Sequence, residues 1–219
     1  MKNTSRDLPQ TRSADVIGEL PGTDPDAEIV LLGAHRDSWD PGTGAQDDGA
    51  GVAIILGAVK ANSDAGLKPR RTLRVVLFAN EEFGASGANR YAQLESGNIS
   101  KHVLAMEADS GADPVYRLAT LLPAERLALG ADILSVVRSL GVEAGDNKAR
   151  DGTDLGPLRQ AGVPQIDLNL DATYYFDIHH TANDTLNQIE PKKLSQSTAV
   201  YAVAAWLAAT EAPAPPPAK

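Results

Sequence analysis

The stretch VVLFANEEFGASG, residues Val75 to Gly87, decides the fold class of this chain. Its first half is apolar and β-branched, which is typical of a buried strand, and it ends at Asn80. Two adjacent carboxylates, Glu81 and Glu82, follow at once, and small residues then lead into a helical pattern. A strand, a polar loop and a helix in this order predict one unit of an α/β domain, with charged groups at the carboxyl end of the strand.

The same alternation of strand and helix continues along the chain. Apolar runs predict strands over residues 15–20, 28–35, 72–80, 102–109 and 162–170, and helical patterns predict helices over 48–61, 85–94, 123–140 and 190–210. We therefore expect an α/β fold, a three-layer α/β/α sandwich with a mostly parallel twisted sheet. Residues 1–14 read as a polar lead-in, 15–210 as one catalytic domain, and 211–219 as a disordered Pro/Ala tail.

Composition restricts the classes of function. The chain has 219 residues, a formal net charge of −9 and no cysteine. The acidic balance argues against a nucleic-acid partner, because binding to phosphates needs a basic patch. Without cysteine, any metal must be held by His, Asp and Glu. No apolar run approaches the roughly 20 residues of a membrane span, and the first residues contain no apolar signal-peptide core.

Acidic and imidazole side chains follow the predicted strands or lie in the loops between strand and helix. They are His35, Asp47, Asp48, Glu81, Glu82, Asp109, His179 and His180. Each has an ordinary structural explanation by itself; Asp48, for example, precedes a helix as an N-cap would. Together they should meet at one edge of the sheet, where carboxylates repel one another unless a cation neutralises them. Two histidines and several carboxylates indicate two Zn²⁺ or similar divalent ions in a hydrolytic site.

Five sequence blocks, found in this order, carry a resemblance to a known family. They are GAHRDSWDPGTGAQDDGAG, GLKPRRTLRVVLFANEEFGASG, HVLAMEADSG, DGTDLGPLRQAGVP and FDIHHTANDT. The chain resembles, from about Asp15 to Thr210, the co-catalytic di-zinc aminopeptidase family, which also contains glutamate carboxypeptidases and the transferrin receptor ectodomain. The resemblance implies a zinc-exopeptidase type of fold and two bound Zn²⁺ ions, for which Co²⁺ or Mn²⁺ are substitutes.

The resemblance implies five metal ligands in this sequence: His35, Asp47, Glu82, Asp109 and His180. Asp47 would bridge both ions, His35 and Asp109 would complete one site, and Glu82 and His180 the other. The peptide bond that follows Asp47 is cis in the family. Two neighbours compete with these assignments at the level of sequence, because Glu107 lies two positions before Asp109 and His179 directly precedes His180.

The resemblance also implies the catalytic roles. Glu81 matches the general base, which takes a proton from a water activated by the two metals and passes it to the leaving amine. Asp37 resembles the carboxylate that orients the ring of His35. The reaction expected is hydrolysis of small peptides with a free N-terminus by an aminopeptidase or dipeptidase.

The residues that contact the substrate are less well defined by the pattern. A tyrosine occupies the place of His179 in many relatives, so His179, Tyr175 and Tyr174 are alternatives for the group that faces the developing oxyanion. Thr153 and Asp154 match a family loop beside the cleft and are candidate substrate contacts.

Two other functions are compatible with a fold of this family. One is a glutaminyl-cyclase-like enzyme with a single zinc, and the other is a catalytically silent metal-binding module, as in the transferrin receptor. The chain is short at its N-terminus relative to the family, without a lid domain or signal peptide, so we expect a more open cleft. Many family members are secreted or periplasmic, which leaves the localisation unassigned, and a homodimer is compatible with the family.

Overall fold

The structure, a computed structural model of the chain, describes residues 4, 6, 8–24, 26 and 28–212. In this part of the chain, seven strands form one sheet in the order β1-β3-β2-β4-β7-β5-β6. The strands are β1 (Val16–Leu20), β2 (Ile29–His35), β3 (Thr72–Phe78), β4 (His102–Glu107), β5 (Val115–Leu121), β6 (Glu143–Ala144) and β7 (Gln165–Leu170). The pairs β2·β3, β2·β4, β4·β7 and β5·β6 are parallel, whereas β1·β3 and β5·β7 are antiparallel.

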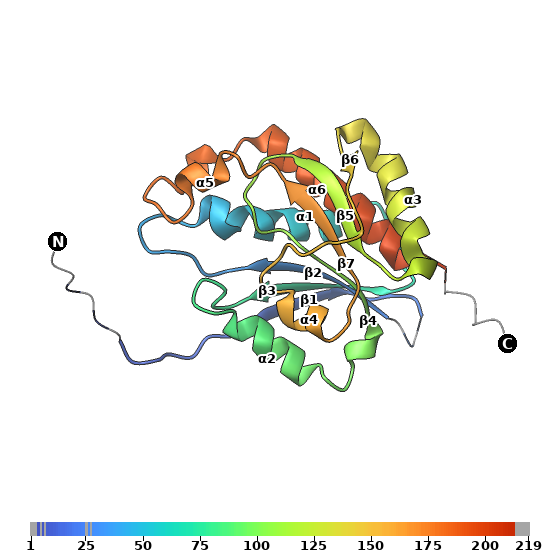
Figure 1. Cartoon of the computed structure of the whole chain (residues 1–219), viewed down its shortest axis with the longest axis horizontal. Helices are drawn as coiled ribbons and strands as arrows, with labels where there is room; N and C mark the ends of the chain where they lie inside the picture. The colour runs from blue at the N-terminus through green and yellow to red at the C-terminus, as the bar shows by residue number, and fades with distance from the viewer. Residues whose placement is uncertain (1–3, 5, 7, 25, 27, 213–219) are drawn as a thin grey trace.

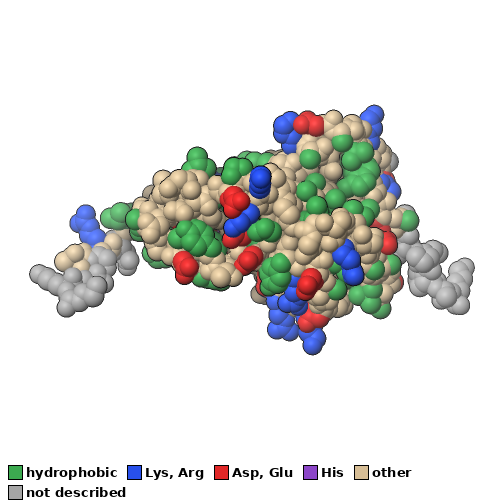
Figure 2. Space-filling model, turned by 90° about the horizontal axis from the view of Figure 1, so that it is seen from above, with side chains coloured by type: hydrophobic (Ala, Val, Ile, Leu, Met, Phe, Trp, Pro, Cys, Tyr) green, Lys and Arg blue, Asp and Glu red, His purple; other side chains and the backbone are tan. Residues whose placement is uncertain are grey.

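Helices cover both faces of the sheet (Figure 1), which confirms the predicted α/β/α sandwich. One layer contains α1 (Ala50–Asp64), α3 (Leu127–Val137) and α6 (Pro191–Thr210), and the other contains α2 (Ser86–Leu94) and α4 (Gly156–Gln160). Figure 2 shows the first layer from outside, with hydrophobic side chains interspersed among charged ones. None of the described helices combines the length and the hydropathy needed to cross a membrane.

The position of β2 in the centre of the sheet explains why its sequence is continuously apolar. All of its residues are buried, because both faces of the strand are covered by helices. Val30 and Leu32 pack into the hydrophobic cluster beneath α1 and α6. Ile29 and Leu31 point the other way, into the cluster beneath α2 and α4. The strand is therefore held firmly on both sides, and its last residue, His35, has a fixed position.

Some elements differ from the sequence-based expectation. Among the strands and α-helices, four were not predicted: β5, β6, α4 and α5 (Tyr175–Ile178). The predicted helix over 123–140 divides into a 3-10 turn, α3, and a second 3-10 turn at Arg138–Leu140. Strand β7 begins at Gln165 rather than at Gly162, because Gly162 has a positive φ of 86° that belongs to a turn.

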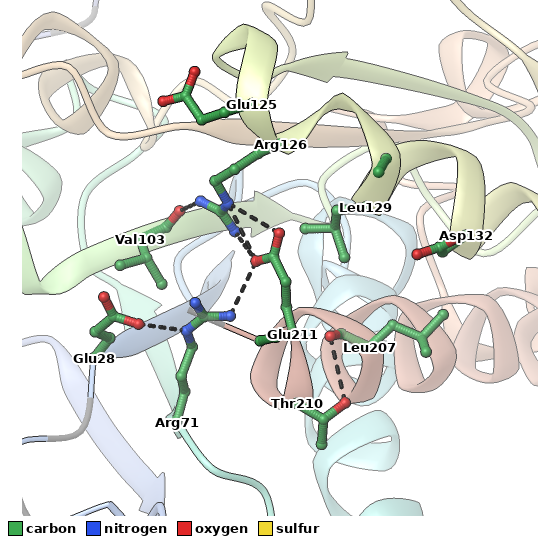
Figure 3. A pocket seen from close by; sticks show the side chains of 12 residues that line it. Glu28, Arg71, Val103, Glu125, Arg126, Leu129, Asp132, Leu207, Thr210 and Glu211 are labelled. Atoms are coloured by element: carbon green, nitrogen blue, oxygen red, sulfur yellow. Dashed lines mark hydrogen bonds and ion pairs between the residues drawn. The ribbon is translucent and has the colours of Figure 1, made fainter. Parts of the chain in front are cut away.

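A cluster of ion pairs joins α6 to the amino ends of β2 and β3 (Figure 3). The Glu211 carboxylate pairs with Arg71, at 3.0 Å from Nη1, and with Arg126, at 2.7 Å from Nη2. Arg71 also pairs with Glu28 at 2.6 Å, and the whole group lines a cavity of about 520 Å³. Glu211 is the first residue of the predicted tail over 211–219; residues 213–219 lie outside the described residues.

Candidate metal centre

The first group of candidate ligands lies at the carboxyl end of β2. His35 Nε2 is 3.1 Å from Asp47 Oδ1 and 3.4 Å from Asp109 Oδ1. His35 is only 1% exposed and Asp47 only 3%, and Asp109 follows the neighbouring strand β4. Although burial lowers the pKa of His35, the carboxylates of Asp109 and Asp47 raise it to about 12. The negative charge around this imidazole therefore strongly favours a bound positive charge.

The second group shares Asp47 with the first. His180 Nε2 lies 3.0 Å from Asp47 Oδ2 and 2.9 Å from Glu82 Oε2. The two oxygens of Asp47 thus face different histidines, and Asp47 belongs to both sets of groups that could hold an ion. In each set, the nitrogen and oxygen atoms lie within 4.8 Å of one another, which is compatible with Zn²⁺ at about 2.0–2.2 Å from each.

The donor atoms fit divalent cations in their chemistry as well as in their spacing. Asp47 Oδ2 and Glu82 Oε1 are buried, and neither accepts a hydrogen bond from a described residue. Burying a carboxylate oxygen without a partner is costly, and a bound cation would remove that cost. Imidazole nitrogens and carboxylate oxygens without thiolates suit Zn²⁺, and also Co²⁺ or Mn²⁺.

The loop that carries Asp47 is held by a residue that sequence reasoning did not assign. The buried carboxylate of Asp184 accepts hydrogen bonds from the backbone N–H groups of Gln46, at 2.6 Å, and Asp47, at 3.2 Å. The only signal in the sequence was its place in the block FDIHHTANDT. Asp184 therefore fixes the bridging residue from a segment more than a hundred positions away in the chain.

Asp48 links the same loop to β2 and α1. Its Oδ2 accepts a hydrogen bond from the backbone N–H of His35, and its Oδ1 accepts one from Gly51 in the first turn of α1, both at 3.0 Å. It thus satisfies an N–H in the first turn of α1 and joins the helix to the strand, although the N-cap residue is Gly49 and not Asp48. The Asp47–Asp48 peptide bond is cis, which confirms the expectation drawn from the resemblance.

Asp37 connects β2 to the loop that follows β3. Its carboxylate accepts hydrogen bonds from the backbone N–H groups of Glu81, at 3.1 Å, and Glu82, at 3.4 Å. The ring Nδ1 of His35 faces the Asp37 carbonyl oxygen at 3.0 Å, and the carboxylate is farther away at 3.8 Å. Asp37 therefore orients His35 mainly through its backbone, while its side chain positions the two glutamates.

Glu81 itself lies beside the two candidate ligand groups without belonging to either. Burial raises the pKa of Glu81, and the hydroxyl of Thr153 acts in the opposite direction. A raised pKa brings a carboxylate closer to the range in which it accepts and returns protons efficiently near neutral pH.

The geometry distinguishes Asp109 from Glu107, and His180 from His179, as members of the ligand groups. Asp109 lies against His35, whereas Glu107 uses Oε2 to accept a hydrogen bond from Leu155 N–H at 3.2 Å and belongs to neither ligand group. His180 belongs to the second ligand group, whereas the ring of His179 stacks on Tyr175 with a centroid distance of 4.7 Å.

The two tyrosines that are candidate substrate contacts differ in their burial and in their neighbours. Tyr175 is buried, and burial together with the charges of Asp109 and Asp47 raises the pKa of its phenol. Tyr174 is more exposed and donates its hydroxyl to Gln188.

The two residues of the nearby loop also differ. Thr153 is exposed beside Glu81. Asp154 is only 1% exposed, so its side chain is buried. Burial and the neighbouring Glu81 carboxylate raise the pKa of Asp154 to about 8.

Comparison with known proteins finds related sequences and structures over most of the chain. The model of peptidase family M28 matches residues 15–205. The chain is 39% identical over 217 residues to carboxypeptidase Q of Rattus norvegicus, a match that covers 95% of this chain and 44% of the relative. It is 46% identical to a peptidase M28 precursor of Shewanella amazonensis, whose crystal structure superposes with a TM-score of 0.87 over 92% of this chain and 47% of that one. A zinc aminopeptidase of Bacillus subtilis shares the fold, with a TM-score of 0.73 at 18% identity over 90% of this chain and 50% of that one.

The sequence blocks predict a particular likeness to plasma glutamate carboxypeptidase, also called carboxypeptidase Q, and the relative from rat confirms it. The chain spans about 44% of the length of that relative. The activity of the longer relatives is therefore relevant to this chain only where the chain contains the residues concerned.

Proposed function

The chain belongs to peptidase family M28, and from this premise we propose that it is a metal-dependent exopeptidase acting on short peptides with a free N-terminus. The observation that carries the proposal is the position of Asp47, whose two carboxylate oxygens face the imidazoles of His35 and His180 at 3.1 and 3.0 Å. A carboxylate shared by two groups of ligands is what a two-metal hydrolytic centre requires.

We assign one divalent ion to His35, Asp47 and Asp109, and a second to Asp47, Glu82 and His180. Bound there, the two ions would polarise the scissile carbonyl and lower the pKa of the attacking water. Zinc is the ion proposed, because the donors are imidazole nitrogens and carboxylate oxygens in a compact arrangement.

The remaining chemistry belongs to Glu81 and Tyr175. Glu81 is outside both ligand groups and is held by its backbone N–H to Asp37, so its carboxylate is available to accept a proton from water and return it to the leaving amine. The phenol of Tyr175 stays protonated and is a hydrogen-bond donor for the oxyanion that forms on the substrate carbonyl. The acidic groups around the centre favour a substrate with a positively charged α-amine.

The experiment that tests this proposal compares free dipeptides with the same dipeptides blocked at the N-terminus. We expect the purified protein to hydrolyse the free dipeptides, to lose activity when a chelator removes metal, and to recover it when Zn²⁺ is returned. Glu81→Gln is the matched inactive control, because it preserves the size of the side chain. Cleavage of blocked and free dipeptides at equal rates would contradict the proposed polarity.

Two other outcomes would favour other functions. One metal per chain together with cyclisation of an N-terminal glutamine would indicate a glutaminyl-cyclase-like enzyme. Metal binding without turnover of any dipeptide would indicate a silent module.

A further inference from the structure

The indole of Trp39 contacts two of the residues assigned to the same metal ion. Its Nε1–H donates a hydrogen bond to Glu82 Oε2 at 2.6 Å. Its ring also packs on the imidazole of His180, with a centroid distance of 5.2 Å and an angle of 39° between the planes. Within the described residues, Trp39 makes no hydrogen bond or ring contact with His35 or Asp109. Its contacts are therefore confined to one side of the centre.

The indole is itself held in place. Phe83 directly follows Glu82 in the sequence, and its ring lies 5.0 Å from that of Trp39. Trp39 therefore contacts the phenyl ring of Phe83 and the imidazole of His180, and its N–H donates to the carboxylate of Glu82. Trp39 is 39% exposed, so it lies at the surface and does not belong to the hydrophobic core.

The hydrogen bond of Trp39 determines how the Glu82 carboxylate presents its oxygens. Oε2 receives the indole N–H, whereas Oε1 is buried and accepts no hydrogen bond from a described residue. A carboxylate with one oxygen held by a donor cannot rotate freely, so its orientation toward a cation is set in advance.

His180 needs support for a different reason. It has a positive φ of 59°, a conformation that residues other than glycine adopt rarely, and its side chain is 41% exposed. Two rings contact its imidazole: that of His179, with a centroid distance of 4.4 Å, and the indole of Trp39.

We propose that Trp39 is a positioning residue for the divalent ion assigned to Asp47, Glu82 and His180, and that it has little effect on the ion assigned to His35. The inference rests on the proposed two-metal function. Loss of a hydrogen-bond partner of a metal ligand typically weakens metal binding by about 10–100-fold. We expect a loss of that size for one ion only.

The test measures metal affinity directly, by competition between the apo-protein and a chromophoric chelator for added Zn²⁺. Trp39→Phe retains a ring that packs on His180 but has no N–H for Glu82. We expect one of the two Zn²⁺ equivalents to bind about 10–100-fold less tightly, with the other unchanged. Trp39→Tyr, which also retains a ring, is the second variant should Trp39→Phe not fold. Trp206→Phe is the matched control, because it removes the other tryptophan, which lies on α6.

The outcomes separate this inference from the proposed function. If the unmodified protein binds two ions and Trp39→Phe binds both just as tightly, the inference is wrong while the proposed centre stands. Equal weakening of both ions would also overturn it, because the effect would then be general. If the unmodified protein binds no Zn²⁺, the proposed function fails, and the role of Trp39 fails with it.

Discussion

The carboxylate of Asp37 accepts a hydrogen bond from the backbone N–H of Glu81, with 3.1 Å between Oδ1 and N. Asp37 lies two residues after His35, and its backbone carbonyl faces the ring of that histidine. One residue therefore links the imidazole of the first ligand group, at the end of β2, to the proposed general base, in the loop that follows β3. The distance between ligand and base depends on this link.

Replacing Asp37 by Asn should disturb the position of Glu81. The amide keeps one oxygen that can accept an N–H, but its NH₂ group would face the second backbone N–H, from Glu82, and two donors repel one another. Small displacements of a catalytic group reduce rates by up to about 100-fold, so we expect kcat to fall about 10–100-fold while bound metal is retained. Steady-state kinetics and metal analysis on the same sample check this, and an unchanged kcat would contradict the role of Asp37.

Replacing Asp184 by Ala should both destabilise the protein and reduce its metal content. The substitution leaves the buried N–H groups of Gln46 and Asp47 without an acceptor. Each unsatisfied group costs about 1–3 kcal/mol in the free energy of unfolding, and the loop that carries Asp47 would lose its anchor. Denaturant unfolding and metal analysis measure the two effects. Asp64→Ala, in an exposed ion pair with Lys60 on α1, is the control and should cost less than about 1 kcal/mol.

The buried carboxyl group of Asp167 should make the free energy of unfolding depend on pH. Burial raises the pKa of Asp167 to about 6, from 3.8 for the exposed group, so the folded protein binds this proton more tightly than the unfolded chain does. Its contribution to stability is therefore greatest below pH 4 and is lost as the pH rises through about 6.

The variant Asp167→Asn isolates this effect. Both backbone N–H groups that bond to Asp167, those of Arg150 and Asp151, use the same oxygen, which the amide retains. We expect the variant to exceed the unmodified protein in stability at pH 7 by up to about 3 kcal/mol. The difference should shrink as the pH falls toward 4, as measured by unfolding at several pH values. A difference that does not vary with pH would show that the charge is not responsible.

Glu211 should stabilise the end of α6 through its two arginines. The Glu211→Gln variant keeps the size of the side chain but removes the charge that Arg71, only 4% exposed, and Arg126 share (Figure 3). We expect a loss of about 2–3 kcal/mol in the free energy of unfolding, because Arg71 retains Glu28 as a partner. Glu125 lines the same cavity and pairs with no described cation, so Glu125→Gln is the matched control. Equal effects of the two substitutions would contradict this account.

Much of the fold could be predicted because the strands of the sheet centre are buried on both faces. Runs such as Ile29–His35 are continuously apolar, which marks them as strands in the sequence alone. Strand β5, Val115–Leu121, could not be recognised in the same way, because the exposed Tyr116 and the half-buried Arg117 interrupt its apolar pattern. Its place beside β7, in antiparallel pairing, follows from tertiary contacts that no local pattern encodes.

The residues of the site also divide into those with a local signal in the sequence and those without one. Residues such as His35 and Glu82 could be named because charged groups directly after buried strands are conspicuous, and the family resemblance supplied their roles. The residues that hold them could not be assigned in full. The hydrogen bond from Trp39 to Glu82 and the two accepted by Asp184 join loops that are remote in sequence, and exposed tryptophans and aspartates occur in many loops without such a role.

The most direct test of the central claim measures bound metal and peptidase rate side by side for Glu81→Gln and Glu82→Gln. We expect Glu81→Gln to retain both ions and to lose about 10²–10⁴-fold in kcat, because the amide cannot accept a proton. Glu82→Gln should instead lose the ion on the His180 side and recover part of its activity in excess Zn²⁺. Normal turnover by Glu81→Gln, or loss of metal from Glu81→Gln but not from Glu82→Gln, would contradict the assignment of base and ligand.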